Sequence, residues 1–195
     1  GFDDKILIGN HEQIKKNIDF VYTGSLYCGR EVYMMQFLNV LRELNCEFNK
    51  KINCLLIGNI PIEFEGNYHD LIKKNELEIR KKIPQQDVYQ IIKCARWGLV
   101  IMPEIYPEAV STKICEYPAL KTPVFACHGG GDLDKLIKNY KLGISCDFRK
   151  QSRQSLKDLI KNSIESKNEE YGLNVDQFKF SNLAKNYAKI INGNK

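Results

Sequence analysis

Short apolar runs alternate with helical patterns along most of this chain, and no other feature constrains its fold as strongly. Residues 99–102 and 123–126 are apolar runs next to prolines, which is typical of interior strands. The residues from Ser111 onward, between these runs, have the composition of a capped helix. A strand, a helix and a second strand in this order predict two parallel strands joined by a right-handed crossover.

The same alternation continues on both sides of this unit. We expect strands at residues 20–23, 52–57, 77–80, 98–102, 124–126 and 143–146, and helices at 31–44, 67–74, 85–95, from 111 and at 133–139. Two further helices, 152–166 and 177–191, follow without a strand between them. The sequence therefore predicts an α/β fold, a Rossmann-like doubly wound parallel sheet of about six strands with helices on both faces and two C-terminal helices.

Apolar side chains at helical spacing mark the faces that three of these helices should bury. They are Met34, Phe37, Leu38, Leu41 and Leu44 in the helix at 31–44, and Val88, Ile91 and Ile92 in the helix at 85–95. The last helix carries Phe180, Leu183, Ala184, Tyr187 and Ile191. We expect this stripe to pack across the domain.

The length of 195 residues suits one domain with extensions. Residues 1–18 are polar apart from 6–8, and we assign them to an interdomain linker or N-terminal segment. Residues 19–195 form the expected domain.

Composition narrows the class of protein. The net charge of +5 comes from lysines spread along the chain, whereas nucleic-acid-binding proteins concentrate basic residues, so we expect no nucleic-acid partner. No apolar run is long enough to cross a bilayer, and nothing resembles a signal peptide. Seven cysteines without a CxxC pair indicate reduced, buried thiols in a cytoplasmic protein. A basic surface also suits phosphate ligands or peripheral association with the cytoplasmic membrane face.

Residues 107–126 carry the strongest chemical signal. Glu108 and Glu116 are separated by seven residues and lie on either side of the expected helix start. The intervening Ser111, Thr112 and Lys113 offer a hydroxyl cap, backbone N–H groups and a cation, which suit a pyrophosphate. The alternative is an ordinary capped helix.

Each of the two carboxylates also has two interpretations. Glu116 has apolar neighbours, and a buried carboxylate needs hydrogen-bond partners such as ribose hydroxyls, but it could instead lie on the exposed side of the helix. Glu108 could reach a hexose hydroxyl or simply favour the positive helix end.

Residues 24–31 have the outline of a Walker A loop between a strand and a helix. Arg30 replaces its lysine and Glu31 its magnesium-binding hydroxyl, so we reject a P-loop NTPase. What is left is a glycine turn at Gly24 that presents Arg30, whose guanidinium can hold phosphate oxygens, although it could also be a surface arginine. Residues 128–131 are a second turn rich in glycine, and we expect no metal at Asp132 and Asp134, which suit a helix start.

At these residues the chain resembles the C-terminal, donor-binding domain of GT-B glycosyltransferases, most closely the retaining family called glycosyl transferases group 1. That family has a Glu, seven residues and a second Glu, then a helix of small residues and Gly/Lys-x-Pro-Val. Residues 20–24 with Arg30, 83–88, 94–98 and 1–3 are similar to further family segments. The main motif is matched by Glu108, Glu116, Ala119, Lys121, Pro123 and Val124.

The resemblance implies a role for each matched residue. Glu116 would bind the ribose, and Glu108 the hydroxyls of the donor sugar. The amides around Val110, Ser111 and Thr112 would hold the diphosphate with Gly24 and Arg30, and the backbone of Lys82 and Ile83 would face the base. Glu108 and Arg30 are the expected catalytic residues. The family commonly supplies a lysine besides the arginine, and a glycine-rich loop where this chain has residues 109–111.

The implied activity is retaining transfer of a sugar from a nucleotide-diphosphate donor to a glycan or lipid-linked glycan, with no metal and no cofactor. The acceptor domain, which the family places before this one, lies outside the 195 residues, so we expect the isolated chain to be inactive. A non-catalytic nucleotide-sugar-binding module, a sugar-nucleotide epimerase of related fold and a plain interaction domain remain alternatives.

Overall fold

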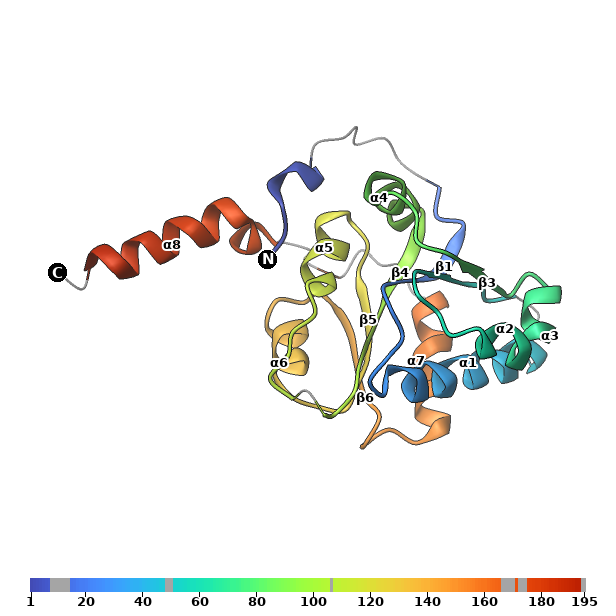
Figure 1. The fold of residues 1–195 in the computed structure, drawn as a ribbon. Coiled ribbons are helices and arrows are strands. Elements are labelled where there is room, and N and C mark those ends of the chain that lie inside the picture. Colours follow the sequence, from blue (N-terminus) through green and yellow to red (C-terminus); the bar gives the residue numbers. More distant parts are fainter. Residues whose placement is uncertain (8–14, 48–50, 106, 166–170, 172–174, 194–195) are drawn as a thin grey trace.

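The computed structural model describes residues 1–7, 15–47, 51–105, 107–165, 171 and 175–193. Six parallel strands form one sheet in the order β3-β2-β1-β4-β5-β6, as the sequence predicts (Figure 1). The strands are β1 (Ile18–Thr23), β2 (Cys54–Ile57), β3 (Leu77–Arg80), β4 (Ala95–Met102), β5 (Val124–His128) and β6 (Gly143–Asp147).

Helices cover both faces of this sheet. They are α1 (Arg30–Glu47), α2 (Glu63–Asn67), α3 (His69–Lys73), α4 (Gln85–Lys93), α5 (Lys113–Ala119), α6 (Asp132–Asn139), α7 (Arg153–Glu165) and α8 (Phe180–Gly193), with short 3₁₀ helices η1 (Asp4–Leu7) and η3 (Asp176–Phe178). Alternate strand residues point to opposite faces. Phe20 and Tyr22 of β1 therefore join the core under α1, α2, α3 and α7, whereas Val21 joins the core under α4, α5 and α6.

Most boundaries differ from the sequence prediction by a few residues, and three of the differences have a clear structural reason. The strand β4 begins at Ala95, inside the predicted helix, because Ala95 pairs with Ile18 of β1. The helix predicted at 67–74 corresponds to α3, whereas α2 was not predicted; the two are separated at Tyr68, whose backbone leaves the helical conformation. Helix α5 begins at Lys113 instead of Ser111, so it is only seven residues long.

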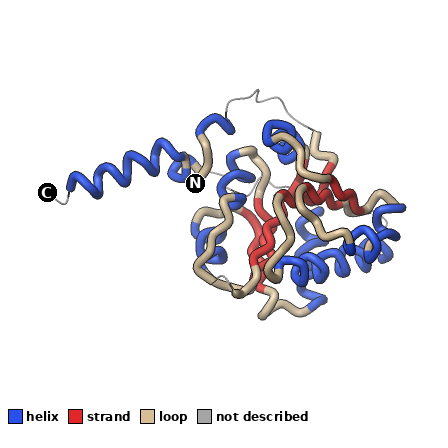
Figure 2. Tube along the Cα trace, in the orientation of Figure 1, coloured by secondary structure: helices blue, strands red, loops and turns tan. Residues whose placement is uncertain are grey.

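The prediction that the last helix packs across the domain is wrong. Helix α8 extends away from the body of the domain (Figures 1 and 2). Tyr187 and Ile191 of its apolar stripe are 67% and 68% exposed, and Leu183 near its start is half-buried. The amphipathic pattern correctly identified the helix but could not identify what it packs against.

The cysteines follow the prediction in part. All seven are free thiols, and Cys54, Cys115, Cys127 and Cys146 are buried. Cys28 and Cys46 are exposed, so the expectation of uniformly buried thiols is wrong for them. Cys28 lies in the loop before α1 and Cys46 on the last turn of that helix, where the side chains face solvent.

Candidate functional site

The strand order places a topological switch point between β1 and β4, at the centre of the sheet. The chain leaves the carboxyl end of β1 toward one face and that of β4 toward the other, since α1 and α5 pack on opposite faces. Open α/β sheets bind ligands in the crevice outside such a point. The candidate site is therefore the carboxyl edge of the sheet around Thr23 and Met102.

A cavity of about 480 Å³ lies at this edge. The turns after β1, β2 and β3 form one side, and α4 with the start of α5 forms the other. Three predicted donor-binding residues, Gly24, Lys82 and Ile83, lie together in its wall. The complete described lining is Thr23, Gly24, Ser25, Ile57, Gly58, Asn59, Lys82, Ile83, Gln85, Val88, Tyr89 and Lys113. A larger groove of about 700 Å³ runs along β2 and β3, and its described lining includes none of the predicted site residues.

Lys113 and Glu116 form an ion pair on one face of α5, with 2.5 Å between Nζ and Oε2. The side chain of Glu116 is 12% exposed and that of Lys113 is 29% exposed. Glu116 therefore does not lie on an exposed stripe, which excludes that interpretation. Tyr89 of α4 lines the cavity. Burial raises the pKa of Tyr89, and the nearby Glu116 and Asp3 carboxylates raise it further. Glu116 is therefore close enough to α4 for its charge to act on Tyr89.

Tyr117 fixes α5 to the end of β1. Its hydroxyl oxygen accepts a hydrogen bond from the backbone N–H of Thr23 at 3.1 Å and lies 3.0 Å from Thr23 Oγ1. Burial raises the pKa of Tyr117 far above its usual value, so the phenol is neutral. The helix that carries Lys113 and Glu116 is thus held against the turn that contains Gly24.

Arg30 is the first residue of α1 and lies half-buried after the same turn. Its guanidinium carbon is 4.8 Å from the centre of the Tyr27 ring, a cation–π contact. Burial raises the pKa of Tyr22 to about 12, and the positive charge of Arg30 opposes this rise. The guanidinium of Arg30 therefore lies near Tyr22. The described lining of the 480 Å³ cavity does not include Arg30.

The segment that precedes α5 is more open than the sequence suggests. Glu108, Val110 and Thr112 are exposed, and Ser111 is half-buried. Ser111 Oγ accepts a hydrogen bond from the backbone N–H of Lys113 at 3.3 Å, but Thr112 is the residue next to the helix and already has helical dihedral angles. None of these four residues is in the described lining of the cavity, although Lys113, which follows Thr112 directly, is part of it.

Nine of the twelve described lining residues were not among the predicted donor-binding residues, and Lys113 and Tyr89 are two of these nine. The sequence named Lys113 as a cation suited to a pyrophosphate at the expected helix start but assigned it no donor-binding role, and the structure places it in the cavity lining. Tyr89 falls between Val88 and Ile91 on a helix, where periodicity assigns it to no particular function. Only the packing of α4 against the carboxyl edge of the sheet brings it to the cavity.

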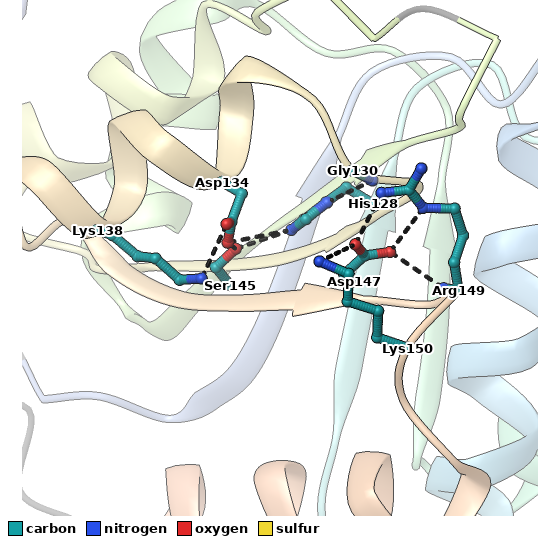
Figure 3. Close-up of polar contacts among 8 residues, drawn as sticks. All are labelled: His128, Gly130, Asp134, Lys138, Ser145, Asp147, Arg149 and Lys150. Carbon is teal, nitrogen blue, oxygen red and sulfur yellow. Dashed lines mark hydrogen bonds and ion pairs between the residues drawn. The ribbon is translucent and has the colours of Figure 1, made fainter.

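A second polar cluster lies after β5 and β6 (Figure 3). His128 is fully buried, and its Nε2 lies 2.7 Å from Ser145 Oγ, which in turn lies 2.5 Å from Asp134 Oδ1. On the other side, Arg149 donates to both carboxylate oxygens of Asp147 at 3.1 and 2.9 Å. The sequence indicated only a glycine-rich turn at this place.

The described residues include no group of three or more His, Cys, Asp or Glu side chains arranged to hold a metal ion. Asp132 and Asp134, which the sequence singled out, pair instead with Lys135 and Lys138. In the part of the chain that the structure describes, no helix is long and apolar enough to cross a membrane.

No protein-family model matches the chain, and no curated protein matches it in sequence. Solved structures share its fold. The C-terminal domain of LpcC from Francisella tularensis, a glycosyl transferase group 1 family protein, matches with a TM-score of 0.61 and 12% identity, covering 92% of this chain and 100% of that chain. This is the fold of a GT-B glycosyltransferase domain.

Two other structures with this fold contain UDP. Anabaena Alr3699/HepE, in complex with UDP and glucose, has a TM-score of 0.66 and 15% identity, with 99% of this chain and 55% of that chain covered. The pneumococcal O-GlcNAc transferase GtfA, in complex with UDP and GlcNAc, has a TM-score of 0.64 and 11% identity, with 93% and 37% covered. The chain thus spans about half or less of these two GT-B proteins.

Proposed function

We propose that this GT-B chain is the donor-binding domain of a glycosyltransferase and that its donor is a UDP-sugar. The observation that supports this most is the cavity at the switch point, which gathers Gly24 from the turn after β1 and Lys82 and Ile83 from the turn after β3, together with Lys113. The presence of UDP in two proteins of the same fold supports uracil as the base.

In this proposal the nucleotide lies along the carboxyl edge of the sheet. The backbone of Lys82 and Ile83 faces the base, and Glu116 accepts hydrogen bonds from the ribose hydroxyls. Lys113 now neutralises Glu116. When the donor binds, Lys113 turns to the diphosphate beside Gly24, and Glu116 is released to the ribose. After this exchange Lys113 is paired with the diphosphate and Glu116 is hydrogen-bonded to the ribose hydroxyls. Both charged groups keep a partner, which matters because a buried charge without one is costly in free energy.

The donor sugar lies toward Glu108, and Arg30 binds the diphosphate from the first turn. The bond between the anomeric carbon and the diphosphate oxygen breaks, and UDP leaves with the electron pair. The acceptor hydroxyl bonds to the anomeric carbon on the same face and gives its proton to the departing diphosphate. Arg30 and Lys113 stabilise the negative charge that develops there, so the reaction proceeds without a metal or a cofactor.

The acceptor is a glycan or lipid-linked glycan held by a domain that precedes residue 1, and membrane association at the cytoplasmic face is part of this proposal. Phe2 exchanges backbone hydrogen bonds of 3.0 Å with Phe178 and Phe180, so the first residues lie beside the start of α8. A preceding domain would emerge next to the exposed apolar stripe of α8. We expect this chain alone to bind donor but to transfer no sugar.

Calorimetric titration of the chain with UDP, GDP and ADP tests the donor assignment. Binding of UDP with loss in Glu116→Gln is the expected result, with Glu78→Gln, an exposed carboxylate on β3, as the control that keeps binding. At about a hundred times the dissociation constant, UDP should raise the free energy of unfolding by about 2.7 kcal/mol. Absence of binding by all three nucleotides would leave an interaction domain as the better description.

Activity assays on the longer protein distinguish a glycosyltransferase from a non-catalytic binding module and from an epimerase. A binding module would keep donor affinity and show no transfer, and its behaviour would not depend on Glu108. An epimerase would convert the donor without any acceptor. Transfer that requires both an acceptor and Glu108 is the result expected for a glycosyltransferase.

A further inference from the structure

Residues 129–131 form a turn after β5 that lies under the loop leading into α5. We refer to residues 103–105 and 107–112 as the β4–α5 loop. Gly129 donates its N–H to the Met102 carbonyl at 3.0 Å, and a Cβ atom on Gly129 would overlap Glu104. The turn therefore touches the loop where it leaves the sheet.

The same turn touches the loop again next to Glu108. Asp132 donates its N–H to the Pro107 carbonyl at 3.0 Å. Gly131 has φ of 95°, a left-handed value that favours glycine, and a Cβ atom there would overlap the Pro107 carbonyl. The backbone position of Glu108 is thus set by its neighbour Pro107, which rests on this turn.

His128 holds the turn from inside the protein. Its Nδ1 accepts a hydrogen bond from the Gly130 N–H at 2.9 Å, so Nδ1 carries no proton. The proton of the neutral ring is then on Nε2, which donates to Ser145 Oγ. Ser145 in turn donates its hydroxyl hydrogen to Asp134, so every group in this series has its partner (Figure 3).

Arg149 closes the turn from outside. A Cβ atom on Gly130 would overlap its guanidinium, which therefore lies directly against the Gly130 backbone. Asp147 fixes the orientation of that guanidinium by two hydrogen bonds. The turn is thus enclosed between a buried imidazole and an oriented guanidinium, and it also contacts the β4–α5 loop at Glu104 and Pro107.

We propose that His128 is a positioning residue for Glu108: by holding the 129–131 turn it fixes the loop from which Glu108 reaches the donor sugar. This inference rests on the proposed function of the site. His128 is not in the described lining of the 480 Å³ cavity, and the turn that it holds contacts Glu104 and Pro107 of the β4–α5 loop, so we expect its effect at the sugar end of the donor.

The arrangement also makes the sugar end sensitive to acid. A doubly protonated imidazole has no acceptor at Nδ1, and the Gly130 hydrogen bond is lost when the ring is charged. Four charged groups surround the ring: Asp134 and Lys138 from α6, Asp147 from β6 and Arg149 from the following turn. Burial lowers the pKa of His128. The two carboxylates raise this pKa and the two cations lower it further, so the ring is neutral at pH 7.

Two substitutions separate the two nitrogens of the ring. His128→Asn places an amide oxygen near the position of Nδ1 and can still accept from Gly130. His128→Gln reaches instead toward Ser145 and leaves Gly130 without its acceptor. The measurement is the affinity of the complete chain for UDP, UDP-glucose and UDP-N-acetylglucosamine by calorimetric titration between pH 5 and pH 8.

We define the preference as the ratio of the affinity for the more tightly bound UDP-sugar to the affinity for UDP. We expect His128→Gln to lower this ratio about tenfold while its affinity for UDP stays unchanged. His128→Asn should have the ratio of the native protein. As the pH decreases from 7 to 5, this preference should fall further in the native protein than in His128→Asn, and the comparison cancels the titration of the UDP terminal phosphate, which both proteins share. Equal preferences in His128→Gln and the native protein at every pH would overturn the inference. Failure of the native protein to bind UDP would instead reject the proposed function.

Discussion

Tyr117 of α5 and Thr23 of β1 are joined by two hydrogen-bonding contacts inside the core, at 3.1 Å to the Thr23 nitrogen and 3.0 Å to its hydroxyl. They lie 94 residues apart in the sequence. The pair connects the helix that carries Lys113 and Glu116 to the turn that carries Gly24. This contact therefore holds α5 and the turn after β1, the two parts of the candidate site, against each other.

Replacing Tyr117 by phenylalanine should lower the free energy of unfolding by about 1–3 kcal/mol, because it leaves the buried Thr23 N–H without an acceptor. Urea denaturation measures this change. Tyr187→Phe is the control, since Tyr187 is 67% exposed and should show no effect. Equal stability of Tyr117→Phe and the native protein would mean that the Thr23 groups find other partners.

Gly98 of β4 lies directly under the Tyr117 ring, where an added Cβ atom would overlap the ring carbons. We expect Gly98→Ala to destabilise the protein by about 1–3 kcal/mol, since overpacking forces the ring and α5 to move. Gly66 in α2 has no atoms within 4 Å of an added Cβ, so Gly66→Ala should be neutral or stabilising by up to about 1 kcal/mol. Thermal unfolding of the two variants gives the comparison, and a stable Gly98→Ala variant would contradict the close packing.

The sequence was sufficient for the sheet because its inner strands β2, β1, β4 and β5 are mostly apolar runs, which a parallel sheet buried on both faces requires. It failed at Ala95, because an alanine after Val88, Ile91 and Ile92 continues a helical stripe, and only pairing with Ile18 makes it a strand residue. At the site, Gly24, Lys82 and Ile83 could be placed together from strand ends alone. Tyr89 could not, because its contact with the cavity depends on how α4 packs.

Lys113 should discriminate between UDP and uridine. In our proposal its ammonium group contacts the diphosphate, so Lys113→Gln should weaken UDP binding by about tenfold to a hundredfold, as expected for a hydrogen bond between charged groups. Uridine has no phosphate, so the variant should bind it at least as tightly as the native protein, in which Glu116 must first leave Lys113. Lys74→Gln is the control, because Lys74 is exposed at the opposite edge of the sheet. Calorimetric titration with both ligands measures the difference, and equal losses for UDP and uridine would contradict a phosphate contact.

The buried imidazole of His128 should make the protein less stable in mild acid. Burial holds its pKa below the ordinary value of 6.5, so the unfolded chain takes up a proton that the folded chain resists. This contribution to stability is complete above pH 6.5 and is lost as the pH falls from 6.5 through the folded pKa, with a slope of at most about 1.4 kcal/mol per pH unit. Urea denaturation of the native protein and of His128→Asn from pH 8 to pH 5 isolates this group. Parallel stability curves for the two proteins would show that His128 titrates normally.

The exposed stripe of α8 gives a test of where its partner lies. Ile190 and Ile191 are 63% and 68% exposed, so Ile190→Gln with Ile191→Gln should change the free energy of unfolding of this chain by less than about 0.5 kcal/mol. As a matched substitution in the core, Ile137→Gln should cost several times more, because Ile137 of α6 is fully buried. If the acceptor domain that we propose covers α8, the same double substitution should destabilise the longer protein clearly. A large loss in this chain alone would instead show that the stripe packs on the domain, as its sequence pattern suggests.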